Sequence, residues 1–292
     1  MRTLSQVLRD TTAKFPKRPA ILEPSGAKLT YAELSEKVDQ LARGLLDLGV
    51  GKGEKVGLWM PNMAEWIVAY FAIARIGAVV VPMNTRYKTH EVEYILGNSE
   101  ATTLFAVDSF VGIDYLSMID EIRAKLPNLK HVVIVGKAGK DMHRIDDVMA
   151  RGARGLTDGK LGEREATCKP QDNVFILYTS GTTGNPKGAM LSHHNIAHNG
   201  EQVTEVLHAT EKDVFLLAVP FFHCFGCVMG IAGAITWGAS MVPMQVFKAN
   251  EALELVERFG VSVLYGVPTM FVLELEENRK GKAGGGKYNI ST

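Results

Sequence analysis

One stretch of the chain decides the fold, and it reads Val174-Phe-Ile-Leu-Tyr-Thr-Ser-Gly-Thr-Thr-Gly-Asn-Pro-Lys-Gly-Ala-Met-Leu-Ser-His-His-Asn195. Its first five residues are apolar and rich in β-formers, which predicts a buried strand over Val174–Tyr178. A small, polar segment follows, which contains the hydroxyl residues Thr179, Ser180, Thr182 and Thr183, the glycines Gly181, Gly184 and Gly188, and Lys187. A loop rich in N–H and O–H donors, with one lysine and no carboxylate, suits a phosphate group.

The spacing of this loop differs from that of a Walker A motif, in which four residues separate the glycines and a helix begins at the lysine. Here only two residues separate Gly181 from Gly184, and Pro186 and Gly188 flank Lys187, which disfavours a helix at that point. We therefore predict a strand–loop–strand frame, with a short strand over Ala189–Leu191 and a helix capped near Ser192. The alternative is a flexible surface loop without a ligand.

The segment Tyr178–Gly188 resembles the signature loop of the adenylate-forming superfamily, which includes acyl-CoA synthetases, peptide-synthetase adenylation domains and luciferases. The segments Leu29–Leu34 and Trp66–Tyr87 are also similar to acyl-CoA synthetases at these positions. The resemblance implies that the loop holds the β- and γ-phosphates of ATP while a carboxylate attacks the α-phosphorus. It assigns nucleotide binding to Thr179, Ser180, Gly181, Thr182, Thr183, Gly184 and Lys187.

The composition is that of an ordinary globular protein, with 292 residues of which 46% are hydrophobic and 22% are charged. Lysine plus arginine and aspartate plus glutamate both number 32, so no charge bias indicates binding to nucleic acid. The first residues, Met1–Phe15, lack the apolar core of a signal peptide. Three cysteines do not form a disulfide framework, and we expect a cytoplasmic protein.

Three features admit two interpretations each. Val214–Phe247 contains no charged residue, but its prolines and glycines divide it into a predicted strand, helix and strand, so burial is favoured over a membrane span. Cys224 and Cys227 are a lone pair, which we interpret as two small core residues rather than a metal or redox site. We interpret the histidine cluster as a helix end, and predict no metal site built from protein side chains; this cluster consists of His193, His194 and His198.

Strands and helices alternate along the chain, which predicts an α/β fold with mainly parallel sheets. We expect two stacked α/β halves, residues 1–135 and 170–292, each with its own sheet. The polar, glycine-rich residues 136–169 are expected to be a connecting loop region with a short helix at Ile145–Ala150. The resemblance implies that residues 1–292 form part of the large N-terminal AMP-binding (adenylation) domain of the superfamily.

A second motif, Val219–Gly226, follows a predicted strand and precedes an apolar helix expected over Cys227–Trp237. The resemblance implies that this motif lines the acyl pocket and that His223, its candidate catalytic residue, lies near the substrate carboxylate. The alternative is a core histidine with a satisfied hydrogen bond. Tyr265–Met270 resembles the next pocket wall, so the candidate substrate-binding residues are Phe222, His223, Phe225, Gly226, Tyr265 and Gly266.

The residues of this motif also restrict the substrate. Amino-acid-activating relatives carry an aspartate just after the phenylalanine of the motif, but Phe221–Cys224 contains none, and an unpaired buried ammonium would be costly. An apolar acid, fatty or aromatic, is favoured by Phe222, Phe225, Met229, Met241 and Met244. The resemblance implies two steps: formation of an acyl-adenylate from the acid and Mg²⁺-ATP, then transfer of the acyl group to coenzyme A.

Three elements of the family pattern are absent from residues 1–292: the Thr-Glu segment, the ribose-binding aspartate and the C-terminal domain with its lysine. We therefore expect an N-terminal fragment of an acyl-CoA synthetase that is inactive alone, with a homodimer as one expected oligomeric state. Two alternatives stay open. One is an acyl-AMP ligase that loads a carrier protein, and the other is a non-catalytic module that binds nucleotide or acyl groups.

Overall fold

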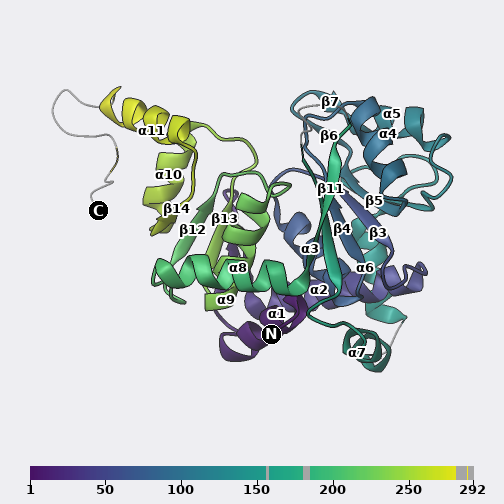
Figure 1. Cartoon of the computed structure of the whole chain (residues 1–292). Coiled ribbons are helices and arrows are strands. Elements are labelled where there is room, and N and C mark those ends of the chain that lie inside the picture. Colours follow the sequence, from purple (N-terminus) through teal and green to yellow (C-terminus); the bar gives the residue numbers. More distant parts are fainter. Residues whose placement is uncertain (156–157, 180–184, 281–287, 289–292) are drawn as a thin grey trace.

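A computed structural model describes residues 1–155, 158–179, 185–280 and 288, and two sheets lie side by side in it (Figure 1). The larger sheet consists of β3 (Lys55–Trp59), β4 (Val79–Pro82), β5 (Ala101–Val107), β8 (His131–Val135), β9 (His143–Arg144), β10 (Asn173–Thr179) and β11 (Lys187–Ser192). Its strand order is β11-β10-β4-β3-β5-β8-β9, and its neighbours are parallel except for β10 with β11.

The smaller sheet consists of β1 (Pro19–Leu22), β2 (Lys28–Thr30), β12 (Val214–Leu217), β13 (Ser240–Pro243) and β14 (Val263–Leu264), in the order β14-β12-β13-β1-β2. Here only β1 and β2 are antiparallel. A separate two-stranded hairpin joins β6 (Ser109–Phe110) to β7 (Ile113–Asp114). The prediction of an α/β fold with mainly parallel sheets is confirmed.

Each of the two sheets contains strands from both halves of the chain. β1 pairs with β13, so that Ile21 lies beside Met241, and β10 pairs with β4, so that Phe175 lies beside Val80. The expectation that residues 1–135 and 170–292 each build their own sheet is therefore wrong for β1, β2, β10 and β11. Hydrophobic patterning identifies a strand but not its partner, and this pairing is decided by long-range packing.

Helices surround and separate the sheets: α1 (Leu4–Lys14), α2 (Tyr31–Asp47), α3 (Ala64–Arg75), α4 (Thr89–Asn98), α5 (Tyr115–Arg123), α8 (His193–Val206), α10 (Ala249–Phe259) and α11 (Pro268–Lys280). A capping box begins α2, because Thr30 accepts from the Glu33 backbone and Glu33 accepts from the Thr30 backbone. α3 lies in the core, and its rings touch both motifs: Tyr70 is 5.1 Å from Phe175 of β10, and Trp66 is 5.4 Å from Phe221 after β12. This helix therefore joins the two sheets through apolar packing.

The connecting region is more ordered than its composition predicts. It forms β9, then α6 (Ile145–Arg154) and α7 (Asp158–Ala166), in place of a loop with one short helix. α6 packs so closely on α2 that a Cβ atom on Gly152 would lie 1.9 Å from the Gln40 carbonyl oxygen, and one on Gly44 would lie 2.2 Å from the Val148 carbonyl oxygen. These glycines serve helix–helix contact rather than turns, and a glycine count does not separate the two uses.

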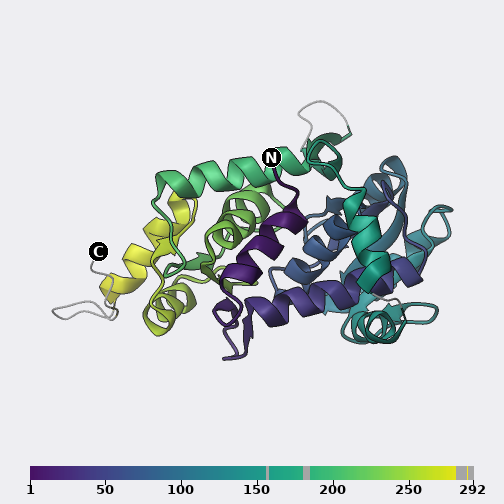
Figure 2. The same cartoon turned by 90° about the horizontal axis from the view of Figure 1, so that it is seen from below.

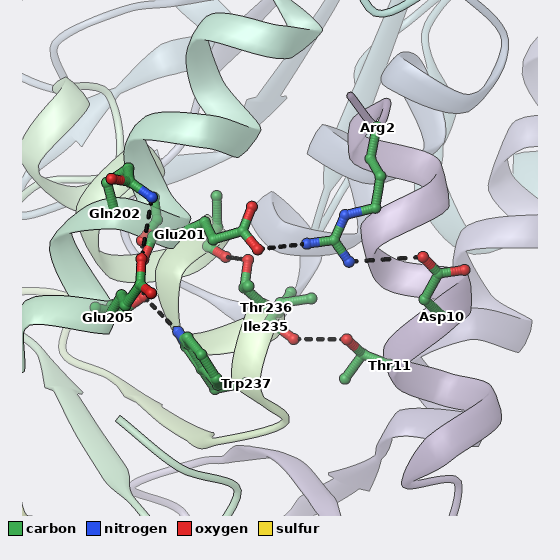
Figure 3. Close-up of polar contacts among 12 residues, drawn as sticks. Arg2, Asp10, Thr11, Glu201, Gln202, Glu205, Ile235, Thr236 and Trp237 are labelled. Atoms are coloured by element: carbon green, nitrogen blue, oxygen red, sulfur yellow. Dashed lines mark hydrogen bonds and ion pairs between the residues drawn. The ribbon is translucent and has the colours of Figure 1, made fainter. Parts of the chain in front are cut away.

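The N-terminal helix α1 packs against elements that are distant in sequence, including α8 and the segment before β13 (Figure 2). Arg2 pairs with Asp10 and with Glu201 of α8, and Thr11 donates a 2.8 Å hydrogen bond to the Ile235 carbonyl oxygen (Figure 3). Nearby, the Trp237 ring N–H donates to the Thr204 hydroxyl oxygen at 2.8 Å. α1 thus holds α8 against the helical segment that follows the second motif.

The charge-free stretch is confirmed as a succession of short elements: β12, the π-helix η1 (Phe225–Ala232), α9 (Gly233–Trp237) and β13. Among the described residues, no helix has the length and apolar character needed to cross a membrane. The expected single helix over Cys227–Trp237 is divided and begins earlier, at Phe225.

Candidate active site

The signature segment forms a hairpin of β10 and β11. The strands are antiparallel, with Thr179 opposite Lys187 and Tyr178 opposite Gly188. The predicted strand–loop–strand frame is therefore confirmed, and the helix that follows is capped by Ser192, as expected. Ser180, Gly181, Thr182, Thr183 and Gly184 lie outside the described residues. Thr179 and Lys187 are both exposed, and the Thr179 hydroxyl donates a long bond of 3.4 Å to the Lys187 carbonyl oxygen.

Two residues of α4 anchor the hairpin. The Tyr178 hydroxyl donates to Asn98 Oδ1 at 2.6 Å, and the Tyr94 hydroxyl donates to the Pro186 carbonyl oxygen at 3.2 Å. The rings of Tyr94 and Tyr178 meet edge to face at 6.4 Å, and burial raises the pKa of Tyr178. Tyr94 and Asn98 were not found by sequence reasoning, because they lie far from the motif and match no pattern of their own.

The end of β10 lies at the same edge of the larger sheet as two other loops. β10 is parallel to β4, and β4 is parallel to β3, so Thr179 ends its strand on the side where residues 60–63 and 83–86 follow β3 and β4. In open α/β sheets, ligands bind outside the carboxyl ends of the strands. β12 and β13 of the smaller sheet are also parallel, and the second motif follows the carboxyl end of β12.

Asn62 joins the two carboxyl edges. Its amide nitrogen Nδ2 donates to the carbonyl oxygens of Leu217 at 3.1 Å and Val219 at 2.9 Å. Its Oδ1 accepts from the Phe221 backbone N–H at 2.8 Å. The second motif is therefore held directly by the loop after β3, a contact between distant residues that no sequence pattern indicates.

A cavity of about 350 Å³ lies at this junction. The loops after β3, β4, β12 and β13 all contribute to its lining, and Phe222 is the candidate substrate-binding residue among them. A second cavity, of about 640 Å³, shares Asn62, Gln245 and Val246 with the first. Phe222 is half-buried, so its ring is available to an apolar ligand.

His223 is exposed and lies two residues before the π-helix η1. Its ring Nδ1 accepts from the Phe225 backbone N–H at 3.2 Å, which leaves Nε2 as the protonated nitrogen of the neutral ring. Its carbonyl oxygen accepts from the N–H groups of Gly226 and Cys227. The interpretation of His223 as a buried core histidine is excluded by its exposure, while its predicted contact with the substrate carboxylate stays a prediction.

The other candidate substrate residues form a packed wall. The rings of Phe225 and Tyr265 are 5.5 Å apart, and the Tyr265 hydroxyl is buried with no hydrogen-bond partner among the described residues. Burial raises the pKa of Tyr265 to about 12. A Cβ atom on Gly226 would lie 2.3 Å from the Pro220 carbonyl oxygen, and one on Gly266 would lie 3.1 Å from the Phe271 ring. Both glycines permit close packing of this wall.

Some sequence interpretations need correction here. Met241 is fully buried in β13 beside Ile21 and Phe215, so it belongs to the core and says nothing about the substrate. Cys227 is a core residue as predicted, but Cys224 is exposed. In the described ranges, no group of three or more His, Cys, Asp or Glu side chains could hold a metal ion.

The histidine cluster is a helix end, as expected. His193 is buried at the start of α8, its Nδ1 accepts from the Leu4 N–H at 3.3 Å, and burial lowers its pKa to about 4. His194 and His198 stack on each other on α8. His193 therefore connects the start of α8 to α1.

Comparison with known proteins decides the family. The family model described as AMP-binding enzyme matches residues 8–289. The chain belongs to the AMP-binding enzyme family. This membership agrees with the signature hairpin and with the position of both motifs at the carboxyl ends of parallel strands.

Three relatives illustrate the similarity. The chain is 38% identical over 288 residues to YngI of Bacillus subtilis (strain 168), which is named as an acyl-CoA synthetase. This alignment covers 94% of this chain and 52% of YngI. It is 32% identical over 290 residues to the mitochondrial medium-chain acyl-CoA ligase ACSF2 of Homo sapiens, with 93% and 47% covered. The crystal structure of the anthranilate CoA ligase AuaEII in complex with anthranoyl-AMP matches with a TM-score of 0.83 and 26% identity, over 93% of this chain and 51% of AuaEII. The chain thus spans about half the length of these relatives.

Proposed function

We propose that the complete protein is an AMP-forming acid–thiol ligase, which activates a carboxylic acid with ATP and transfers the acyl group to coenzyme A. The observation that carries this proposal is the β10–β11 hairpin, which places the exposed Thr179 and Lys187 opposite each other at a carboxyl edge. The hairpin has the signature sequence, and its hydroxyl and ammonium donors suit a polyphosphate. Family membership and the names of the relatives support the same activity.

The proposed reaction has two steps. A carboxylate oxygen of the acid attacks the α-phosphorus of ATP, and pyrophosphate leaves. The sulfur of coenzyme A, as the thiolate, then attacks the acyl carbon, and AMP leaves. Lys187, Thr179 and residues 180–184 would hold the β- and γ-phosphates and neutralise the charge that develops on pyrophosphate. Mg²⁺ would arrive bound to the nucleotide.

The acid is proposed to be apolar, either fatty or aromatic. Phe222, Pro220 and Met270 line the smaller cavity, and Phe225 and Tyr265 form the packed wall beside η1. His223 would lie near the carboxylate of the acid, with its protonated Nε2 as the available donor. A cytoplasmic location and a homodimer are predictions, and the three cysteines, which do not suggest a disulfide framework, support the first of them.

The test is acid-dependent exchange of pyrophosphate into ATP by the complete protein, followed by AMP release on addition of coenzyme A. A panel of fatty and aromatic acids supplies the substrates, and an amino acid is the negative control. Lys187→Ala should reduce the exchange strongly, whereas Lys212→Ala, which removes another exposed lysine, should leave it unchanged. If none of the acids in the panel supported exchange, the proposal would be contradicted.

Two alternatives have different outcomes in the same assay. A ligase that loads a carrier protein would catalyse exchange but release AMP only with a phosphopantetheinyl carrier protein. A non-catalytic module would bind ATP or an acid without exchange. The coenzyme A ligase is preferred because YngI, ACSF2 and AuaEII are all named as acyl-CoA synthetases or CoA ligases.

A further inference from the structure

The second motif leaves β12 and turns at Phe221 and Phe222, and the position of this turn decides which of its side chains face the cavity. Phe221 is fully buried, whereas Phe222, the next residue, lines the cavity of about 350 Å³ together with Ala218 and Pro220. Because these two adjacent residues have different surroundings, a shift of the backbone by one residue would exchange Phe221 and Phe222. Something must therefore fix the register of residues 217–222.

The only side chain with several bonds to this backbone, among the described residues, is that of Asn62. Its bonds go to the Leu217 carbonyl, the Val219 carbonyl and the Phe221 N–H, which are alternate residues of the segment. Two acceptors and one donor surround it, so only an amide in one orientation satisfies all three. Asn62 is also 5% exposed, and its polar atoms would be costly to bury without these partners.

The chain next to Asn62 also holds Phe221. Asn62 lies in the loop between β3 and α3, and Trp66, in the first turn of α3, packs edge to face on the Phe221 ring at 5.4 Å. The backbone and the ring of Phe221 are thus held by the same short stretch of chain. Phe222 and His223 directly follow Phe221, so their positions depend on these contacts, and η1 begins two residues after His223.

We propose that Asn62 is a positioning residue for the acid substrate: it fixes the register of the second motif and so presents Phe222 and His223 to the acid. This inference rests on the proposed function, because it assigns the second motif to the acid. It concerns the acid and not the nucleotide, since the signature hairpin is anchored separately by Tyr94 and Asn98.

The experiment measures KM for the acid and for ATP in pyrophosphate exchange by the complete protein and its Asn62→Ala variant. We expect the acid KM to rise about tenfold or more, which corresponds to the loss of one to two buried hydrogen bonds, and the ATP KM to stay within about twofold. Thr103→Val is the matched control, because Thr103 is fully buried on β5 and its hydroxyl has no partner among the described residues. It should change neither KM.

A second variant gives a readout that a merely structural role would not move. In Asn62→Asp, an ionised carboxylate would still accept from the Phe221 N–H but would repel the two carbonyl oxygens, whereas its protonated form could donate to one of them. Activity of Asn62→Asp, relative to the native protein, should therefore recover as the pH falls. If Asn62→Ala does not fold, Asn62→Ser, whose hydroxyl can bond one carbonyl, replaces it in the KM comparison.

The outcomes separate this inference from the proposed function. If no acid of the panel supports pyrophosphate exchange by the native protein, the proposed function fails. If the native protein is active and a folded Asn62→Ala or Asn62→Ser variant keeps both KM values, or raises both equally, the positioning role is overturned. Rapid hydrogen exchange of the Phe221 amide in the native protein, which needs no variant, would also overturn it.

Discussion

The hairpin of β10 and β11 and the segment Ala218–Gly226 are held in place by different means. The hairpin is defined by its own strand pairing, and its functional side chains, Thr179 and Lys187, are exposed. The second segment owes its shape to residues distant in sequence, because Asn62 bonds its backbone and Tyr265 packs on Phe225. A local motif can therefore be read from the sequence, whereas a pocket wall made by long-range contacts must be seen in the structure.

The largest expected effect concerns whether these two regions suffice for the reaction. We predict that residues 1–292 alone turn over well below about 1 per second, the lower end of usual enzyme rates, with Mg²⁺-ATP, coenzyme A and the acid panel. The hairpin can hold the phosphate tail, but the resemblance assigns adenosine binding to elements absent from these residues, and positioning supplies roughly 7–11 kcal/mol of a barrier. Release of AMP at an ordinary enzymatic rate would mean that the two regions are enough.

The next effect tests the hairpin alone. Lys187→Ala in the complete protein should raise the barrier of adenylate formation by about 3 kcal/mol, because a charge-assisted contact to the leaving pyrophosphate is lost. Single-turnover formation of the acyl-adenylate measures this step directly. Lys187→Arg keeps the charge and should lose less. An Ala variant that forms the adenylate at a near-native rate would remove the lysine from the proposed site.

A smaller effect compares one glycine from each region. A Cβ atom on Gly226 would meet backbone, 2.3 Å from the Pro220 carbonyl oxygen, whereas one on Gly188 would meet the movable Ile176 side chain at 2.6 Å. Gly226→Ala should therefore destabilise the chain by about 1–3 kcal/mol, and Gly188→Ala by less. Urea unfolding of both variants measures the difference in stability. Equal losses, or a larger loss for Gly188→Ala, would contradict the close backbone packing described at Gly226.

The sequence predicted the parts of the site that depend on local chemistry. The glycine and hydroxyl pattern after Tyr178, with Pro186 before Lys187, was enough to predict the strand–loop–strand frame and the helix cap at Ser192. It could not predict that β1 and β2 belong to the smaller sheet, because the apolar pattern of a strand is the same whichever sheet it joins. Nor could it separate Met241, a core residue, from Phe222, a cavity residue, since both are apolar.

The smallest expected effect compares one tyrosine hydroxyl from each region. The Tyr178 hydroxyl donates to Asn98 at 2.6 Å, so Tyr178→Phe should lower the free energy of unfolding by about 0.5–1.5 kcal/mol, the usual value of one hydrogen bond. The Tyr265 hydroxyl is buried without a partner among the described residues, so its removal eliminates an unpaired polar group. Tyr265→Phe should therefore leave the stability of residues 1–292 unchanged or raise it by up to about 1 kcal/mol.

Denaturant unfolding of the two tyrosine variants, made in the same chain and measured together, tests this difference in sign. The two substitutions delete the same oxygen atom, so the loss of a hydroxyl as such cancels in the comparison, and what differs is whether the oxygen has a bond to lose. Equal losses of stability would show that the Tyr265 hydroxyl has a bonding partner, and the wall it forms with Phe225 would then be held by polar contacts as well as by packing. A loss at Tyr178 alone would support the division between a hairpin fixed by hydrogen bonds and a pocket wall fixed by apolar contact, in which an unpaired hydroxyl remains free to meet a ligand.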